Sequence, residues 1–421
     1  MGFMRAFLTP LITKVGPSGI SFLLRLASLV GKFGLTLYLA QFLSLDDLGL
    51  YGIVFALSNL AVVVYGGRID HDLSRLLVSK DRFDAGLLLR DQSIFFFFNY
   101  VASIPIVLIG QIFFPGSGLL LLLACVICWL ESYANFLYVN TNALGKSVIA
   151  NAVFFVRSGL WPILVIVAGL AFPSLRNLWF VLVFWALGTG LSIILSLRYL
   201  DALDWPSMNS VAIDWSPIKS ALRRDLPIWL GSMGLVGGSY LDRFVLGAYL
   251  DLKAVGLATF YISFSTSLVT LVTSSVMVVA VPRLIDNAQR REFSHYNRDL
   301  RNSGIKAAAV GGVLALGISI MIPFLADLMR KPEIREHVLA LWLIMGGTWL
   351  RVVAEAAFYG LYSRHKDKSI WIGNIFFLVV SFLLNLIFVP LLGLTGLGLS
   401  SLLANAALLL LRVGGLRPLT P

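Results

Sequence analysis

The chain has 421 residues, of which 58% are hydrophobic and only 13% are charged, and its mean hydropathy is +0.87. Soluble domains carry about 25% charged residues, so this composition excludes an ordinary soluble protein. The net charge of +11 would also suit a nucleic-acid-binding protein, but basic cytoplasmic connections of a membrane protein account for it. We therefore expect a polytopic membrane protein that has no nucleic-acid partner.

Apolar runs of about 20 residues recur along the sequence, and each is long enough to cross a bilayer as a helix. Backbone groups cannot stay unpaired in lipid, so these runs must be helical. Turn sequences such as SLDDLG and PGSG separate many of them. We predict twelve spans, at residues 18–43, 49–66, 92–113, 117–143, 147–170, 177–198, 227–250, 256–281, 304–323, 338–362, 370–388 and 394–413.

Lysine and arginine are distributed unequally between the connections. The side that holds both termini carries 23 of these residues, counting those that flank the connections, whereas the opposite side carries 5. The positive-inside rule therefore places both termini in the cytoplasm. No cleavage site follows Arg5 and Lys14, so we expect the first run to be a retained helix rather than a signal peptide.

Two pairs of similar stretches lie about half a chain apart. LAQFLSLDDLGLYGIVFALSNL (39–60) aligns with LGAYLDLKAVGLATFYISFSTSL (246–268) at a shift of 207, which pairs Gly49 with Gly256. A weaker similarity at a shift of 222 links the sequences GKSVIANAVFF and DKSIWIGNIFF, which enter the fifth and eleventh predicted spans. Both similarities fall at matching places, which indicates an internal duplication.

The duplication predicts an all-α integral membrane protein made of two pseudo-symmetric six-helix bundles. We place the first half at 1–200, a cytoplasmic linker at 201–226 and the second half at 227–421. Six is an even number, so both halves enter the membrane in the same direction and form a parallel repeat. Two such halves can rock around a central cavity, although a duplication without any such mechanism is the structural alternative.

Charged residues lie inside the predicted spans, where a charge at the centre costs roughly 2.5–3.5 kcal/mol. The cations are Arg25, Lys32, Arg157, Arg243 and Arg351, and the anions are Glu131, Asp242 and Glu355. In the first span, Arg25 and Lys32 share one helix face with Ser21, Ser28 and Thr36. The shift of 207 carries Lys32 to Ser239, so we expect the same face to point inward in both halves.

The interior cations outnumber the interior anions by five to three, so a cavity shared by all of them would be positive and would favour an anionic cargo. The arginine fork suits phosphate oxygens in particular. The three acidic residues are candidates for coupling transport to an ion. Structural alternatives remain open: Arg25 can snorkel, Arg351 and Glu355 can pair within one helix, and Asp242 can pair with its neighbour.

Cys125 and Cys128 are the only cysteines, and both lie in one apolar run without other metal-ligating residues at a suitable spacing. We therefore interpret them as packing residues, and we expect no metal site and no cofactor. The sequence has no GxxxxGK[ST] motif, which argues against a nucleotide-driven pump.

Three stretches resemble a known family. DRFVLGAYLDLKAVGLATFYISFSTSL (242–268) resembles the central signature of the polysaccharide-transporter branch of the multidrug/oligosaccharidyl-lipid/polysaccharide (MOP) exporter superfamily. VGKFGLTLYLAQFLSLDDLGLYGIVFAL (30–57) is similar to its first-helix pattern, and FVPLLGLTGLGLSSLLANAALLLL (388–411) is similar to its last hairpin. The resemblance covers the whole chain in order and implies a MATE-like fold.

The resemblance also implies the function of the Wzx-type flippases. These proteins move undecaprenyl-diphosphate-linked oligosaccharide repeat units across the bacterial inner membrane for O-antigen, lipopolysaccharide or exopolysaccharide synthesis. By this resemblance the five interior cations would meet the diphosphate and acidic sugars, the partners would be the lipid-linked oligosaccharide, membrane lipid and other polysaccharide-assembly proteins, and no residue would be catalytic.

Two other functions fit parts of the sequence. A cation-coupled small-molecule exporter of the same superfamily would share the twelve-span plan. A membrane glycan polymerase would need an outward-facing catalytic loop, and the longest outer connection is FLADLMRKPEIREH (324–337). This connection contains Asp327, Glu333, Glu336 and His337 but also three cations, and it has few residues from which to build an active site.

Overall fold

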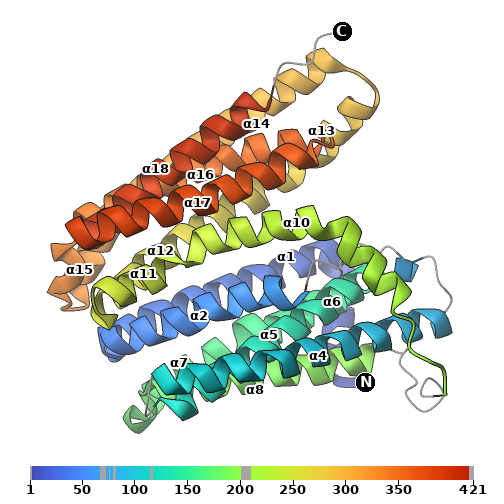
Figure 1. The fold of residues 1–421 in the computed structure, drawn as a ribbon, viewed down its shortest axis with the longest axis horizontal. Helices are drawn as coiled ribbons and strands as arrows, with labels where there is room; N and C mark the ends of the chain where they lie inside the picture. The colour runs from blue at the N-terminus through green and yellow to red at the C-terminus, as the bar shows by residue number, and fades with distance from the viewer. Residues whose placement is uncertain are drawn as a thin grey trace. The chain divides into compact units, whose positions relative to one another are not determined.

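The computed structural model describes residues 2–66, 73–74, 76–78, 82–113, 117–200 and 210–416 of the chain (Figure 1). All regular secondary structure in these ranges is helical. Eleven of the described helices are long and apolar enough to cross a membrane. The expected all-α class is therefore confirmed, and the protein is a multi-pass membrane protein.

The helices of the first half of the chain follow one another through short connections. They are α1 (Gly2–Phe42), α2 (Leu45–Gly66), α4 (Arg82–Phe113), α5 (Gly118–Ala143), α6 (Ser147–Phe155), the π-helix η1 (Val156–Leu160), α7 (Trp161–Ala171), the 3-10 helix η2 (Pro173–Leu175) and α8 (Leu178–Tyr199).

The second half of the chain repeats this plan with a different set of breaks. Its helices are α10 (Ser216–Tyr240), α11 (Asp242–Tyr249), α12 (Leu252–Val272), the π-helix η3 (Thr273–Met277), α13 (Val278–Gln289), α14 (Phe293–Leu328), α15 (Pro332–Glu336), α16 (Val338–Tyr362), α17 (Asp367–Leu392) and α18 (Leu394–Gly414).

Eleven of the twelve predicted spans coincide with the long apolar helices, and the expected span at 227–250 does not. Here α10 begins earlier, at Ser216, and a turn at Leu241 separates it from α11. Polar residues such as Ser232 and Ser239 make this segment less apolar than the other spans. At the predicted third span, 92–113, the helix α4 is longer than the span and begins at Arg82.

The chain divides into two compact units. Unit 1 consists of Met1–Tyr38 and Leu57–Leu226, and unit 2 consists of Leu39–Ala56 and Pro227–Pro421. The boundaries fall inside α1, α2 and α10 rather than in connections between helices. The tip of the α1–α2 hairpin therefore packs with unit 2, and the start of α10 packs with unit 1. Residues 201–209 of the expected linker lie outside the described ranges.

Within unit 1, α5 packs against α8, and the core is aromatic. Phe96, Phe136 and Leu137 are each about 1% exposed and belong to one cluster that also includes Ile218 and Ala221 of α10. Within unit 2, α18 packs against both α16 and α17, and α14 packs against α16 (Figure 1). These two bundles hold the charged side chains described next.

The α1–α2 hairpin tip is fixed in unit 2 by backbone contact with the start of α12. A Cβ atom on Gly49 would overlap the carbonyl oxygen of Leu252, and a Cβ atom on Gly256 would overlap the carbonyl oxygen of Leu45. Lys331 adds a hydrogen bond of 3.3 Å from its Nζ to the carbonyl oxygen of Leu43. The two stretches that are similar in sequence therefore pack on each other.

Candidate functional site

In unit 1, one buried carboxylate joins three segments of the bundle. Glu131 of α5 accepts hydrogen bonds at Oε2 from Arg157 of η1, at 2.8 Å from Nε and 2.6 Å from Nη2. Its other oxygen, Oε1, accepts from Trp185 Nε1 at 2.9 Å and from Thr189 Oγ1 at 2.8 Å, both of α8. Glu131 and Arg157 are only 8% and 7% exposed, so this network lies inside the bundle.

A π-helical turn places Arg157 in this network. The predicted single span at 147–170 is in fact α6, η1 and α7, and Arg157 is the second residue of η1. Short π segments within α-helices occur frequently at functional sites. The guanidinium is not saturated here, because its Nη1 is buried and has no hydrogen-bond partner among the described residues. This nitrogen is a donor without an acceptor.

Helix α1 lies against η1 and brings a second cation to the pair. A Cβ atom on Gly31 would come within 2.8 Å of the carbonyl oxygen of Gly159, so the two backbones touch. The next residue of α1, Lys32, interacts electrostatically with both Glu131 and Arg157. The two cations share one carboxylate, so this part of unit 1 keeps an excess of positive charge.

Arg25 lies two turns earlier on α1 and is held by other groups. Its Nε donates to Asn151 Oδ1 at 2.8 Å, and its Nη2 donates to the Tyr138 hydroxyl at 2.6 Å. The smaller members of the predicted stripe bond within α1, since Ser28 Oγ and Thr36 Oγ1 donate to carbonyl oxygens four residues back. On the polar face of α1, the two cations therefore interact with groups of other helices, whereas the two hydroxyl groups form hydrogen bonds within α1.

Unit 2 contains a comparable cluster. Glu355 of α16 accepts at Oε1 from Arg351 Nε at 2.8 Å and from Arg412 Nη1 at 3.1 Å. The predicted pair of Arg351 and Glu355 within one helix is thus confirmed. Each guanidinium also lies 5.1 Å from a ring centroid, Arg351 over Phe377 and Arg412 over Phe358.

Arg412, near the end of the last predicted span, was not singled out as a candidate site residue from the sequence. It is 1% exposed, and besides Glu355 it donates to Asn374 Oδ1 at 3.0 Å and to the carbonyl oxygen of Ala354 at 3.1 Å. A signal was present: a shift of 224 carries Glu131 to Glu355, and a shift of 223 carries Thr189 to Arg412. The last helix of each half thus sends a donor to the buried glutamate.

Asp242 and Arg243 form the neighbouring pair that the sequence suggested. They lie at the turn between α10 and α11, with Arg243 Nη1 3.2 Å from Asp242 Oδ1. The backbone N–H of Arg243 donates to the same oxygen at 2.8 Å. Arg243 is 2% exposed and lies 5.1 Å from the centroid of the Tyr240 ring.

A cavity of about 260 Å³ lies within unit 2, and the charged side chains of Asp242 and Arg351 are part of its lining. Asn385 of α17 and Asn405 of α18 also line it, and the side-chain oxygen of each is buried without a hydrogen-bond partner in the described part of the chain. A lining that includes a carboxylate and two amide side chains suits a cation or a polar guest. No group of three or more His, Cys, Asp or Glu residues in the described ranges could hold a metal ion.

The five cations predicted to share one cavity are divided between the units. Arg25, Lys32 and Arg157 lie in unit 1 with one interior carboxylate, Glu131. Unit 2 holds Arg243 and Arg351 together with the newly found Arg412, and it has two interior carboxylates, Asp242 and Glu355. Each of the three acidic residues is engaged by an arginine, and the larger positive excess is in unit 1.

Comparisons with known proteins identify the fold. No known protein family's sequence pattern matches the chain, and neither does any curated protein sequence. Its structure is similar to an inward-facing multidrug resistance MATE family transporter of the MOP superfamily, with a TM-score of 0.68 at 15% identity over 92% of this chain and 93% of that one.

It is also similar to the lipid II flippase MurJ in an inward closed conformation, with a TM-score of 0.70 at 14% identity over 94% of this chain and 87% of that one. A MATE structure in complex with MaD3S gives a TM-score of 0.60 at 16% identity over 95% of this chain and 94% of the other. The expected MATE-like fold is therefore confirmed, and the chain has the fold that MATE transporters share with MurJ.

Proposed function

We propose that this protein is a flippase that moves undecaprenyl-diphosphate-linked oligosaccharide repeat units across the bacterial inner membrane, with both termini in the cytoplasm. The observation that carries the proposal is the positive excess inside unit 1, where Lys32 and Arg157 share one carboxylate and Arg157 Nη1 lacks an acceptor. Diphosphate oxygens would supply that acceptor. Similarity to MurJ, a lipid II flippase, supports a lipid-linked cargo.

The proposed mechanism requires no covalent chemistry. The head group of the cargo moves through a polar path with cations, while the prenyl chain remains in lipid. Lys32, Arg157 and Arg25 of unit 1 bind the phosphates and acidic sugars, and Arg243 and Arg351 contribute from unit 2. Movement of one unit against the other then exposes the head group to the other side. We assign no catalytic residue.

A cation-coupled small-molecule exporter is the second candidate, and a specific cavity favours it. Several structural neighbours are MATE transporters, and the cavity of unit 2 brings Asp242 together with the uncommitted oxygens of Asn385 and Asn405. Ion coupling through Asp242, Glu131 or Glu355 would serve either cargo, and of these three residues Asp242 lines this cavity.

A glycan polymerase is disfavoured by the connection that would carry its active site. There, Glu333 forms an ion pair with Lys253 at 3.4 Å, and Asp327 forms one with Arg335 at 2.9 Å. Both carboxylates thus have exposed partners of their own and do not converge on a shared point.

The proposal is tested in vesicles that contain the purified protein and a prenyl-diphosphate-linked oligosaccharide on the inner face only. A membrane-impermeant glycosidase added outside measures how fast the glycan appears there. We expect the wild-type protein to expose the glycan and Lys32→Ala to slow it at least tenfold, while Lys253→Ala, which removes an exposed cation, changes nothing.

Equal rates for vesicles with and without the protein would refute a flippase. In that case, uptake or extrusion of small organic cations by the same vesicles would establish the exporter. In a bacterial host, deletion of the gene should trap completed repeat units on the cytoplasmic face, and other polysaccharide-assembly proteins would act on the units that cross.

A further inference from the structure

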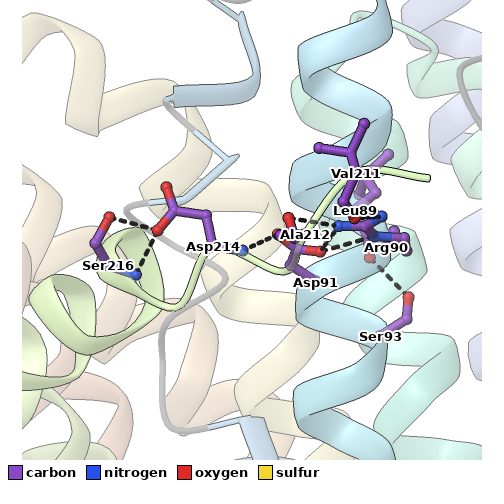
Figure 2. Close-up of polar contacts among 8 residues, drawn as sticks. All are labelled: Leu89, Arg90, Asp91, Ser93, Val211, Ala212, Asp214 and Ser216. Carbon is purple, nitrogen blue, oxygen red and sulfur yellow. Dashed lines mark hydrogen bonds and ion pairs between the residues drawn. The ribbon is translucent and has the colours of Figure 1, made fainter. Parts of the chain in front are cut away.

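A buried ion pair near the start of α4 fastens the segment that leads into α10 (Figure 2). Arg90 and Asp91 are neighbours in sequence and are 2% and 4% exposed, with Arg90 Nη2 2.6 Å from Asp91 Oδ1. Neither residue was singled out as a candidate site residue from the sequence. A buried pair is costly unless further hydrogen bonds satisfy it, which raises the question of what else the pair holds.

The remaining donors and acceptors of the pair go to the backbone of residues 211–214, about 120 positions further along the chain. Arg90 Nη1 donates to the carbonyl oxygen of Val211 at 2.9 Å, and Nη2 approaches that of Ala212 at 3.4 Å. Asp91 Oδ2 accepts the backbone N–H of Asp214 at 3.0 Å. The pair thus binds backbone atoms of this segment, so these contacts do not depend on the identity of its side chains.

Asp214 connects the segment held by the pair to the start of α10. Its Oδ1 accepts from the backbone N–H of Ser216 at 2.9 Å and from Ser216 Oγ at 2.7 Å (Figure 2). Ser216 is the first residue of α10, and N–H groups at a helix start lack partners within the helix. An unbroken series of hydrogen bonds therefore runs from α4 to the first turn of α10.

Helix α10 belongs to unit 1 only as far as Leu226, and unit 2 resumes at Pro227. Proline has no N–H to donate and its ring crowds the preceding turn, so a helix is weakest there. The turns before Pro227 are also held by packing, because Ile218 and Ala221 are each 1% exposed in the core cluster of unit 1. The start of α10 is thus held in unit 1, and the helical hydrogen bonding of α10 is interrupted at Pro227.

We propose that Arg90 and Asp91 are positioning residues that clamp the start of α10 to unit 1, so that α10 changes direction at Pro227 when the units move during transport. The inference goes beyond the proposed function, because it holds for any cargo carried by alternating access. It predicts that the part of α10 before Pro227 keeps its distance from α4, whereas the part after Pro227 does not.

Spin-label distances test the clamp without any substrate. In a Cys125→Ala/Cys128→Ala background, one label is placed at the exposed Phe83 of α4 and the second at Val211, Arg223 or Leu230. We expect narrow distance distributions for Val211 and Arg223 and a broader one for Leu230. An Arg223 distribution as broad as that of Leu230 would overturn the proposal.

Variants then assign the effect to the pair. Arg90→Met should broaden the Phe83–Val211 and Phe83–Arg223 distributions at least twofold, and Arg90→Lys, which keeps the charge but not the fork, should recover part of the order. Asp91→Asn keeps the side-chain shape and should broaden the same two distributions. It provides the test if Arg90→Met does not fold. Unchanged distributions in Asp91→Asn and the arginine variants would refute the clamp.

Two further variants separate the clamp from a general loss of stability. Lys219→Met removes an exposed cation from the same part of α10 and should leave all three distributions unchanged. Pro227→Ala restores the helical hydrogen bond and should narrow only the Leu230 distribution while it slows transport. Transport at the wild-type rate in Pro227→Ala, or a Leu230 distribution that stays broad, would exclude bending at this residue.

Discussion

Gly49 of α2 and Gly256 of α12 lie 207 positions apart in the sequence and make reciprocal contacts in unit 2. A Cβ atom on either glycine would lie 3.2 Å from the backbone nitrogen of the other and would overlap a carbonyl oxygen at the opposite helix start. The two glycines also occupy equivalent positions of the internal repeat. The repeat therefore meets itself at a backbone contact that tolerates no side chain.

The first prediction concerns this contact. Gly256→Ala should lower the free energy of unfolding by about 1–3 kcal/mol or more, because the added Cβ atom overlaps backbone that cannot rotate away. Gly190→Ala in α8 is the matched control, since a Cβ atom there meets nothing within 4 Å. Thermal unfolding of the detergent-solubilised protein should show a lower Tm for Gly256→Ala only. Similar Tm values in both variants would mean that the α12 backbone can move aside.

The second prediction concerns the buried pair of unit 1. Glu131→Gln leaves the Arg157 guanidinium uncompensated, and breaking a buried pair in this way costs about 3–5 kcal/mol. Arg157→Gln leaves the carboxylate without its main partner and should cost a similar amount. The double variant should lose much less than the two single losses combined, as measured by a double-mutant cycle of thermal or denaturant unfolding. Additive losses would show that the two side chains act independently.

The third prediction separates binding from folding at Lys32. This side chain makes no contribution to the hydrogen bonds that Glu131 accepts from Arg157, Trp185 and Thr189. Lys32→Gln should therefore lower Tm less than Arg157→Gln does while transport of a diphosphate-linked cargo falls at least tenfold, and Lys32→Arg should retain more transport. If Lys32→Gln transports normally at a saturating and at a limiting cargo concentration, the assignment of Lys32 to the cargo is wrong.

The fourth prediction ranks the two arginines that share Glu355. Arg412 donates to Glu355, Asn374 and the carbonyl oxygen of Ala354, whereas Arg351 donates to Glu355 only, as far as the described part of the chain shows. Arg412→Leu should therefore destabilise the protein more than Arg351→Leu, because it leaves more buried acceptors without donors. Unfolding of both variants under the same conditions provides the comparison. A larger loss for Arg351→Leu would contradict the ranking.

Much of the fold was readable from the sequence. Each span must satisfy its own backbone in lipid, so length and apolarity predicted eleven helices correctly. The exception is the segment of α10 and α11, which is more polar than the other spans and is broken by a turn at Leu241. The similarity of residues 39–60 to 246–268 indicated a repeat, but only the structure showed that Gly49 and Gly256 touch.

Length, apolarity and internal similarity identify an all-helical membrane protein with a duplicated plan and charges inside its spans, because the bilayer admits few other arrangements of such segments. Which of these charges meet is visible only in the folded structure. It shows Arg157 paired with Glu131 across helices, Arg412 and Arg90 buried beside acidic partners, and the α1–α2 tip packed in unit 2. Such pairings depend on side chains from distant segments converging in three dimensions, which spacing along one helix does not specify.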